Sequence, residues 1–410
     1  MRILSPLQIK KSENALNKIQ EVIRFLNEQY EIRINCFDPT KSVIRSLHRQ
    51  YPYPPSFDDI SLHLAGEGFA INDSMLRKIL RSPNQMTTYN PIHDYLNGLK
   101  GQYSGESQID LLCSHLSARD FGDREPGFYQ ERLRSILRRW LVASVACALG
   151  IRPNDVALGF LQQEEGSGKT YLTRFLVPPS LREFYLISQR SQTVFNLQDA
   201  FARNLIVNFD ELVGINNRTA DEFKKVLSDQ EILVRLPRDP FPKTMPRMAS
   251  AMFTTNRVAE LGGFLTQNLG YRRFACLELS AIDQGYSSKI NVDQLWAEAV
   301  MLLGQDSFLY TFTQEDYESF KLYNLRYQVE TLSMKYIKLY VMQPEGETGE
   351  WLTAGDILHR LMEKRYIRSE DRSRLSREKM GEALRVLKYD RRSIRLPGQG
   401  PRYCYHVIIG

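Results

Sequence analysis

The residues best suited to chemistry form a glycine-rich run that ends in Gly-Lys-Thr, just after an apolar segment at residues 156–161. Such a run predicts a buried strand, a tight loop and then a helix. Backbone N–H groups of the loop and the helix N-terminus bind a β-phosphate, the lysine reaches the β- and γ-phosphates, and the threonine hydroxyl binds Mg²⁺. We therefore predict a site for ATP and Mg²⁺, with Lys169 catalytic and Thr170 a magnesium ligand. The predicted nucleotide-binding residues are Gly166, Ser167, Gly168, Lys169, Thr170 and Tyr171.

One position departs from the full pattern, because Gln163 stands where a first glycine is usual. Gly166 and Gly168 remain, and they supply the positive-φ freedom and close backbone approach that the phosphate side of the loop requires. The first glycine mainly eases the turn out of the strand. Taken alone, so short a motif also fits a flexible surface loop that happens to precede a lysine.

A second apolar segment, residues 205–209, ends in the acidic pair Asp210-Glu211, about forty residues after Lys169. In a nucleoside triphosphatase the first carboxylate holds the Mg²⁺ shell and the second polarises the attacking water. We therefore assign Asp210 to metal binding and catalysis, and Glu211 to catalysis. An acidic pair after a strand can also be only a loop start or a helix cap.

Two further segments complete the set. Residues 249–256 predict a strand that ends in Asn256, which would lie beside the γ-phosphate if this strand lies between the first two. Sixteen residues later, Arg272 and Arg273 offer paired guanidiniums, the group suited to stabilising charge on a transferring phosphoryl group. The alternatives are an asparagine at a strand-end turn and a basic pair on the surface.

In this order, the four segments resemble the core of the virulence-associated protein E family, whose members are AAA+-type NTPases allied to the superfamily 3 helicases of viruses and mobile elements. Residues 30–35 and 89–99 also resemble that family, so that the likeness extends over about residues 20–305. The resemblance implies a hexameric ring that translocates on DNA during replication of a mobile genetic element. It also implies that Arg272 or Arg273, of which we favour Arg272, reaches the nucleotide of a neighbouring subunit.

A second class of function stays open, namely an initiator or assembly factor that binds DNA and uses ATP as a switch, without processive unwinding. The acidic pair argues against an inactive ATPase but does not separate these two classes. No zinc finger or additional carboxylate cluster points to primase chemistry, so we expect any primase to be a separate chain.

Bulk properties agree with this interpretation. At 410 residues, with 42% hydrophobic and 25% charged residues, the chain predicts a soluble protein of two or three domains. It has no signal-peptide pattern and no apolar stretch long enough to span a bilayer, so we expect no membrane partner. Five widely spaced cysteines and six scattered histidines predict neither a disulfide framework nor a metal cluster, and favour the reducing cytoplasm.

The predicted fold class is α/β, with an AAA+ P-loop core between an N-terminal, mainly α-helical domain and a C-terminal winged helix. The boundaries are 1–125 for the helical domain, 126–310 for the ATPase core, 311–330 for a linker and 331–410 for the winged helix. A helix that ends near Leu149 carries four arginines, which we expect to form its solvated face: Arg132, Arg134, Arg138 and Arg139.

Residues 231–247 predict a β-hairpin with a proline-bearing tip. Similar proteins place such a hairpin in the central channel of a hexamer. There Arg238 and Lys243 would contact phosphates of single-stranded DNA and Phe241 would stack against a base. The alternative is a basic surface hairpin with a buried phenylalanine.

The C-terminus is the most basic part of the chain. Residues 360–410 hold 14 Lys and Arg against 6 Asp and Glu, a net charge of +8 in a chain whose total is +6. Two short helices at 353–364 and 376–387, followed by a hairpin, are the order of a winged helix, which we expect to bind duplex DNA. A winged helix that docks another protein is the alternative. The predicted duplex-contacting residues are Arg377, Lys379, Arg391, Arg392 and Arg395.

Overall fold

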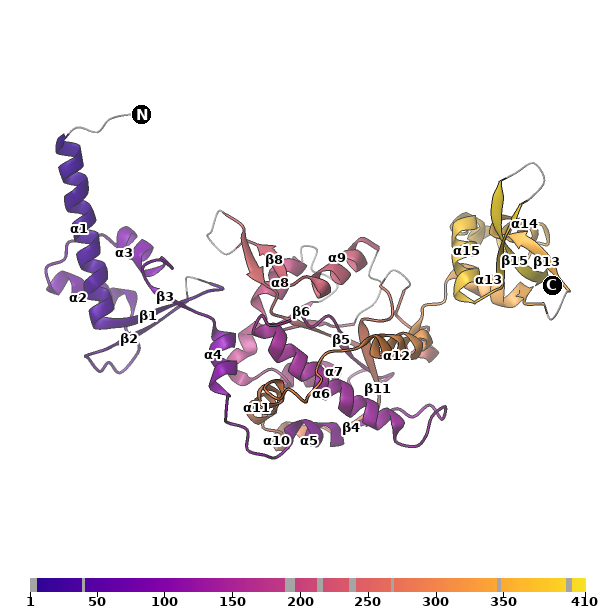
Figure 1. The fold of residues 1–410 in the computed structure, drawn as a ribbon, viewed down its shortest axis with the longest axis horizontal. Helices are drawn as coiled ribbons and strands as arrows, with labels where there is room; N and C mark the ends of the chain where they lie inside the picture. Colours follow the sequence, from indigo (N-terminus) through magenta and orange to yellow (C-terminus); the bar gives the residue numbers. More distant parts are fainter. Residues whose placement is uncertain are drawn as a thin grey trace. The chain divides into compact units, whose positions relative to one another are not determined.

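The computed structural model describes residues 6–38, 41–188, 196–211, 217–235, 241–266, 269–344, 348–395 and 400–410. It divides the chain into two compact units (Figure 1). The first unit comprises Met1–Val258 and Gln267–Leu325, and the second comprises Ala259–Thr266 and Arg326–Gly410. The fold is mixed α/β, and each unit has a hydrophobic core of its own.

A six-stranded sheet forms the centre of the first unit, in the order β4-β11-β5-β10-β7-β6. Neighbouring strands are parallel, except that β4 runs antiparallel to β11. Every residue of β5, β7 and β10 is buried, so both faces are covered, which explains their continuous apolar sequences. β10 pairs with β5 on one side and β7 on the other, so the condition under which Asn256 was expected beside the γ-phosphate is met. The strands are β4 (Leu116–Ala118), β5 (Ala157–Leu161), β6 (Tyr185–Ser188), β7 (Ile206–Phe209), β10 (Ser250–Thr255) and β11 (Phe274–Ile282).

Helices cover the sheet, with α8 and α9 above the strands and α6 and α11 below them in the view of Figure 1. Two completely buried tryptophans fix the lower pair. The indole N–H of Trp140, in α6, donates to the carbonyl of Val156 at 3.0 Å, and that of Trp296, in α11, donates to the carbonyl of Leu176 at 2.8 Å. The helices of this part are α4 (Pro91–Gly98), α5 (Gln108–Ser114), α6 (Phe128–Ala148), α7 (Lys169–Phe175), α8 (Leu197–Arg203), α9 (Asn217–Ser228), α10 (Tyr286–Lys289), α11 (Val292–Leu303) and α12 (Gln314–Asn324).

The arginines of α6 do not form a solvated face, so that expectation is wrong. Arg139 donates two hydrogen bonds to the carboxylate of Asp316, at 2.8 and 2.6 Å, and its guanidinium lies 4.6 Å from the ring centre of Phe312. Arg132 lies 3.8 Å over the ring of Tyr323. Residues 311–324, which include α12 and fall in the predicted linker, pack along α6 and supply these partners. Arg134 and Arg138 pair with Asp110.

The N-terminal segment combines helices with a small sheet, in the order β2-β1-β3. Ile32 and Ile34 lie in β1, where their side chains are buried in a separate core. The elements are α1 (Pro6–Gln29), β1 (Tyr30–Asn35), β2 (Ser42–Ser46), α2 (Phe57–Gly66), α3 (Asp73–Leu80) and β3 (Thr87–Tyr89).

The predicted β-hairpin is confirmed. It consists of β8 (Glu231–Val234) and β9 (Lys243–Pro246), which pair antiparallel with Val234 opposite Lys243. Arg238, at the end of the first predicted arm of the hairpin, lies outside the described residues.

The second unit runs helix, strand, strand, helix, helix, strand, strand. Its helices pack on one face of a sheet in which β15 pairs with β12, β13 and β14. Thr353 forms a capping box with Asp356 at the start of α14, and Ser376 caps α15, close to the predicted starts of both helices. The elements are α13 (Leu332–Tyr340), β12 (Val341–Met342), β13 (Glu350–Thr353), α14 (Ala354–Glu363), α15 (Arg377–Val386), β14 (Arg391–Arg395) and β15 (Pro401–Ile409).

Candidate nucleotide-binding site

A pocket of about 410 Å³ lies at the carboxyl ends of β5, β7 and β10. This volume falls within the range of about 300–1,000 Å³ that is usual for small-molecule sites. The three segments that the sequence singled out therefore meet at one edge of the sheet. The lining residues are Glu165, Gly166, Ser167, Gly168, Lys169, Thr170, Tyr171, Asp210, Glu211, Thr254, Thr255 and Asn256.

The glycine-rich loop has the backbone that phosphate binding requires. Gly166 has a φ of 70° and Gly168, which begins α7, has a φ of 92°. A Cβ at Gly168 would lie 2.2 Å from Nε2 of Gln284, whose side-chain amide donates to the carbonyl of Ser167 at 3.1 Å. Gln163 is not among the residues with positive φ, which explains why glycine is dispensable there.

Lys169 is held inside this loop. Its ammonium donates to the carbonyls of Gln162 and Glu164, at 3.1 and 2.8 Å, and to the hydroxyl of Ser167 at 2.9 Å. Burial lowers the pKa of Lys169, although the nearby carboxylate of Asp210 opposes this effect. The loop is thus already folded around a cation that can move onto an anionic ligand.

Asp210 connects all three segments. Its Oδ1 accepts hydrogen bonds from the hydroxyls of Thr170, at 2.8 Å, and Thr254, at 2.5 Å. Among the described residues no group of three or more His, Cys, Asp and Glu side chains could hold a metal ion. A single carboxylate beside a hydroxyl instead fits Mg²⁺, which proteins commonly hold by one or two carboxylates together with substrate phosphates.

Two more predicted site residues line the pocket: Glu211, directly after Asp210, and Asn256, directly after β10. Glu211 is exposed and has a φ of 52°, a left-handed conformation that costs a residue other than glycine about 1–3 kcal/mol. Such strain is found preferentially at functional sites. Asn256 donates to Oε1 of Glu165 at 3.0 Å, so it lies against the phosphate loop.

Arg272 and Arg273 lie at the opposite end of the sheet. The carbonyl of Arg273 accepts a hydrogen bond at 2.8 Å from the amide of Ala157, the first residue of β5. The glycine-rich loop instead follows the last residue of β5, Leu161. Five strand residues span about 17 Å, so neither arginine lines this pocket. Arg272 is exposed. Arg273 is half-buried, which lowers its pKa, and it donates to the hydroxyl of Ser228 at 2.7 Å.

None of the described residues predicted to contact DNA lines the pocket. Phe241 is 74% exposed, so the alternative of a hairpin with a buried phenylalanine is wrong. Lys243 is exposed at the start of β9. On α15, Arg377 pairs with Glu378 at 2.6 Å, while Lys379 donates to the carbonyl of Arg374 at 2.7 Å. Arg391, Arg392 and Arg395 are exposed on β14.

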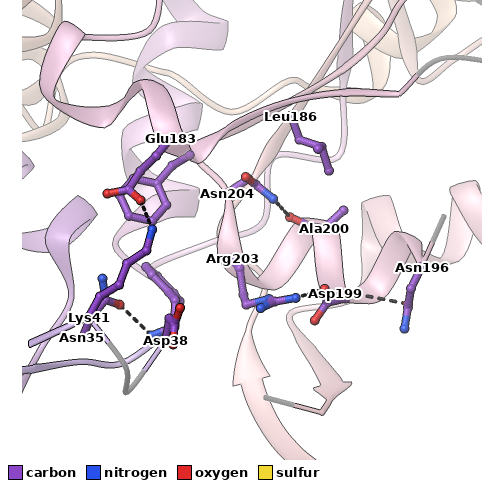
Figure 2. A pocket seen from close by; sticks show the side chains of 12 residues that line it. Asn35, Asp38, Lys41, Glu183, Leu186, Asn196, Asp199, Ala200, Arg203 and Asn204 are labelled. Atoms are coloured by element: carbon purple, nitrogen blue, oxygen red, sulfur yellow. Dashed lines mark hydrogen bonds and ion pairs between the residues drawn. The ribbon is translucent and has the colours of Figure 1, made fainter. Parts of the chain in front are cut away.

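A second pocket, of about 400 Å³, lies between residues 35–38 with Lys41 on one side and the segment that holds β6 and α8 on the other. Figure 2 shows Lys41 directed at Glu183 and Arg203 directed at Asp199, and both pairs are ion pairs. Because these two cations already have carboxylate partners, the arrangement favours a structural contact between the segments over an anion site.

Two contacts of the candidate site were not predicted from the sequence, one made by Thr254, which lines the pocket, and one made by Gln284, which contacts the glycine-rich loop. Thr254 precedes Asn256 in the third strand, and only the three-dimensional register reveals its contact with Asp210. Gln284 follows β11 and has no motif around it, so no signal in the sequence could have identified its contact with the phosphate loop.

Comparisons with known proteins agree with the geometry. The model of the virulence-associated protein E-like domain matches residues 118–329, which is just over half of the chain. The chain therefore belongs to this family. No curated protein matches it.

Solved structures were also compared. The apo structure of the NrS-1 C terminal region aligns with 13% identity and a TM-score of 0.47, and covers 95% of this chain and 99% of that chain. The X-ray structure of JCV helicase aligns with 13% identity and a TM-score of 0.31, and covers 69% of this chain and 81% of that chain.

No helix among the described residues is long and apolar enough to cross a membrane.

Proposed function

We propose that this chain is an AAA+ ATPase of superfamily 3 helicase type, which couples ATP hydrolysis to movement on DNA during replication of a mobile genetic element. The observation that supports it most strongly is the meeting of Lys169, Thr170 and Asp210 at the carboxyl ends of parallel strands. The position of β10 between β5 and β7 is the one that this interpretation requires.

The residues fit Mg²⁺ and ATP. Lys169 would exchange its three contacts within the loop for oxygens of the β- and γ-phosphates. Thr170 and Asp210 would hold Mg²⁺, which when bound neutralises charge on the phosphates. Glu211 would accept a proton from the attacking water, and Asn256 would orient that water.

Assembly into a closed ring of six copies would complete the site. Arg272 is exposed and far from its own pocket, so it is suited to reach the nucleotide of a neighbouring copy. Lys243 and Phe241 would then contact single-stranded DNA in the channel.

The second unit has the element order of a winged helix. We assign duplex contacts to Arg377 and Lys379 at the start of α15 and to Arg391, Arg392 and Arg395 on β14. A docking surface for a replication protein, such as a separate primase, is the alternative for this unit.

The rival function is an initiator that binds DNA and assembles when ATP is bound. Measuring ATP hydrolysis and strand displacement in the same reaction separates the two, with Lys169→Ala as the inactive control. A helicase displaces a strand in proportion to the ATP it hydrolyses. Hydrolysis without displacement, across forked and tailed substrates, would favour the initiator.

A further inference from the structure

The sheet of the second unit presents aromatic and basic side chains on the face opposite its helices. In β15, Tyr405 and Val407 point into the core, so the alternate residue His406 lies on the other face. Trp351 of β13 is the cross-strand partner of His406. Arg392 of β14 is the cross-strand partner of Cys404, which lies two residues before His406 in β15 and therefore on the same face. These side chains therefore share the face away from the helices, which we call the outer sheet face.

Three of the side chains on the outer sheet face form a stack. The rings of Trp351 and His406 are parallel within 6°, with centroids 4.7 Å apart. The guanidinium of Arg392 lies 4.8 Å from the centre of the Trp351 ring. Trp351 and His406 are half-buried and Arg392 is exposed, so part of the stack remains accessible.

Charge favours a polyanion at this face. The described strands β14 and β15 hold no acidic residue, and their alternation places Arg392 and Arg402 on the outer sheet face, whereas Arg391 and Arg395 lie on the opposite face. The cations of α15 alternate instead with Glu378 and Glu382, and Glu378 already pairs with Arg377. The outer sheet face thus combines the two features that bind single strands: cations for phosphates, and flat aromatic rings for bases.

We propose that the outer sheet face binds single-stranded DNA, with an unpaired base stacked on the ring system of Trp351 and phosphates contacted by Arg392 and Arg402. Duplex DNA does not present its base faces, so this site distinguishes single strands from duplex. The site shares Arg392 with the proposed duplex contacts but adds Trp351 and Arg402, which have no part in them, and it does not depend on ATP hydrolysis.

Tryptophan fluorescence tests the site directly. Trp140 and Trp296 are completely buried, so among the three tryptophans only Trp351 is accessible to a nucleobase. Titration of the full chain with oligo(dT), without ATP, is expected to quench Trp351 emission until the site is saturated. Binding at the β8–β9 hairpin leaves this local signal unchanged. An unchanged Trp351 signal at saturating oligo(dT) would overturn the proposal.

Affinity measurements then identify the contacts, in a Phe241→Ala/Lys243→Ala background that removes the hairpin contribution. Trp351→Leu is expected to weaken binding of labelled oligo(dT) about tenfold. The same substitution should leave duplex affinity and the salt dependence unchanged. Arg392→Gln should reduce the slope of log K against log salt concentration by about 0.7.

Two further variants separate the site from general effects. Tyr403→Leu is the matched control. Tyr403 is an exposed aromatic residue of the same strand, and the guanidinium of Arg391 lies 3.5 Å from its ring centre, but its side chain is on the opposite face from the outer sheet face. It should bind oligo(dT) as the background does. Trp351→Phe should restore most of the affinity if a ring is what matters. Equal affinity of Trp351→Leu and the background would show that the stack is only a cross-strand packing contact.

Discussion

Asp210 organises the candidate site because one of its oxygens accepts hydrogen bonds from two hydroxyls on different elements. Thr170 comes from α7 and Thr254 from β10, so the carboxylate is held in place before any ligand binds. Lys169 is likewise bonded three times within its loop. The pocket is preorganised, and small changes in it should alter nucleotide chemistry more than folding.

The lysine and the second carboxylate should separate binding from hydrolysis. Lys169→Ala is expected to lose nucleotide binding, because the main cation for the phosphates is removed. Glu211→Gln should still bind ATP but turn it over slowly, because only the activation of water is lost. Fluorescent-nucleotide titrations and single-turnover rates measure the two effects. Near-normal turnover in Glu211→Gln would place the catalytic base elsewhere.

The contact from Thr254 should matter for magnesium. Thr254→Val removes a hydrogen bond that orients Asp210, and loss of such a partner typically weakens metal affinity or activity 10- to 100-fold. We expect the Mg²⁺ concentration for half-maximal ATPase activity to rise about tenfold. Thr255→Val is the matched control, because that hydroxyl accepts from the amide of Arg257 and does not contact Asp210. An equal Mg²⁺ requirement for both variants would argue against this role.

Among the elements, the central strands were predictable and the contacts between distant helices were not. β5, β7 and β10 are buried on both faces and therefore read as continuous apolar segments. The polar residues at their ends were predictable because parallel strands end at one edge. The arginines of α6 look solvated in sequence, since their partners Asp316 and Tyr323 lie far along the chain. No local pattern encodes such pairings.

The ion pair between α6 and α12 should contribute measurably to stability. Asp316→Asn removes the charge that Arg139 binds, and we expect a loss of about 1.5–3 kcal/mol in the free energy of unfolding. Burial of Asp316 would raise its pKa, but the hydrogen bonds from Arg139 and from the amide of Thr313 outweigh this and lower it. The contribution is therefore complete above the unfolded pKa of about 3.9 and is lost as pH falls through the lower folded pKa.

Denaturant unfolding at several pH values measures this effect. The difference between the wild type and Asp316→Asn should be constant from about pH 5 to 8 and shrink at more acidic pH. Lys321→Gln is the control, because its pair with Glu318 is exposed on the same helix and should contribute less than about 1 kcal/mol. Equal losses in the two variants would contradict the structural role of the α6–α12 pair.

For the whole molecule, the central question is whether subunits complete one another's sites. Among the described residues no arginine lines the pocket, and Arg272 is exposed at the opposite end of the sheet. In the proposed ring, this end of one copy would lie at the pocket of the next. An arginine supplied in this way contributes about 10³-fold or more to the rate.

Mixing two inactive chains tests this arrangement. One chain carries Arg272→Ala and Arg273→Ala, and the other carries Lys169→Ala. In mixed rings some interfaces pair an intact pocket with an intact arginine, so part of the ATPase activity should return. Size-exclusion chromatography with light scattering verifies that mixed rings form. Mixed rings without activity would contradict catalysis across the interface.

The most direct test of the account is the rate of ATP hydrolysis by the full chain with and without single-stranded DNA, with Lys169→Ala measured alongside. If the pocket at the ends of β5, β7 and β10 powers movement on DNA, hydrolysis requires Mg²⁺, increases when DNA is added, and is absent in the Lys169→Ala chain. Hydrolysis that does not respond to DNA, or that persists without Lys169, would contradict the account.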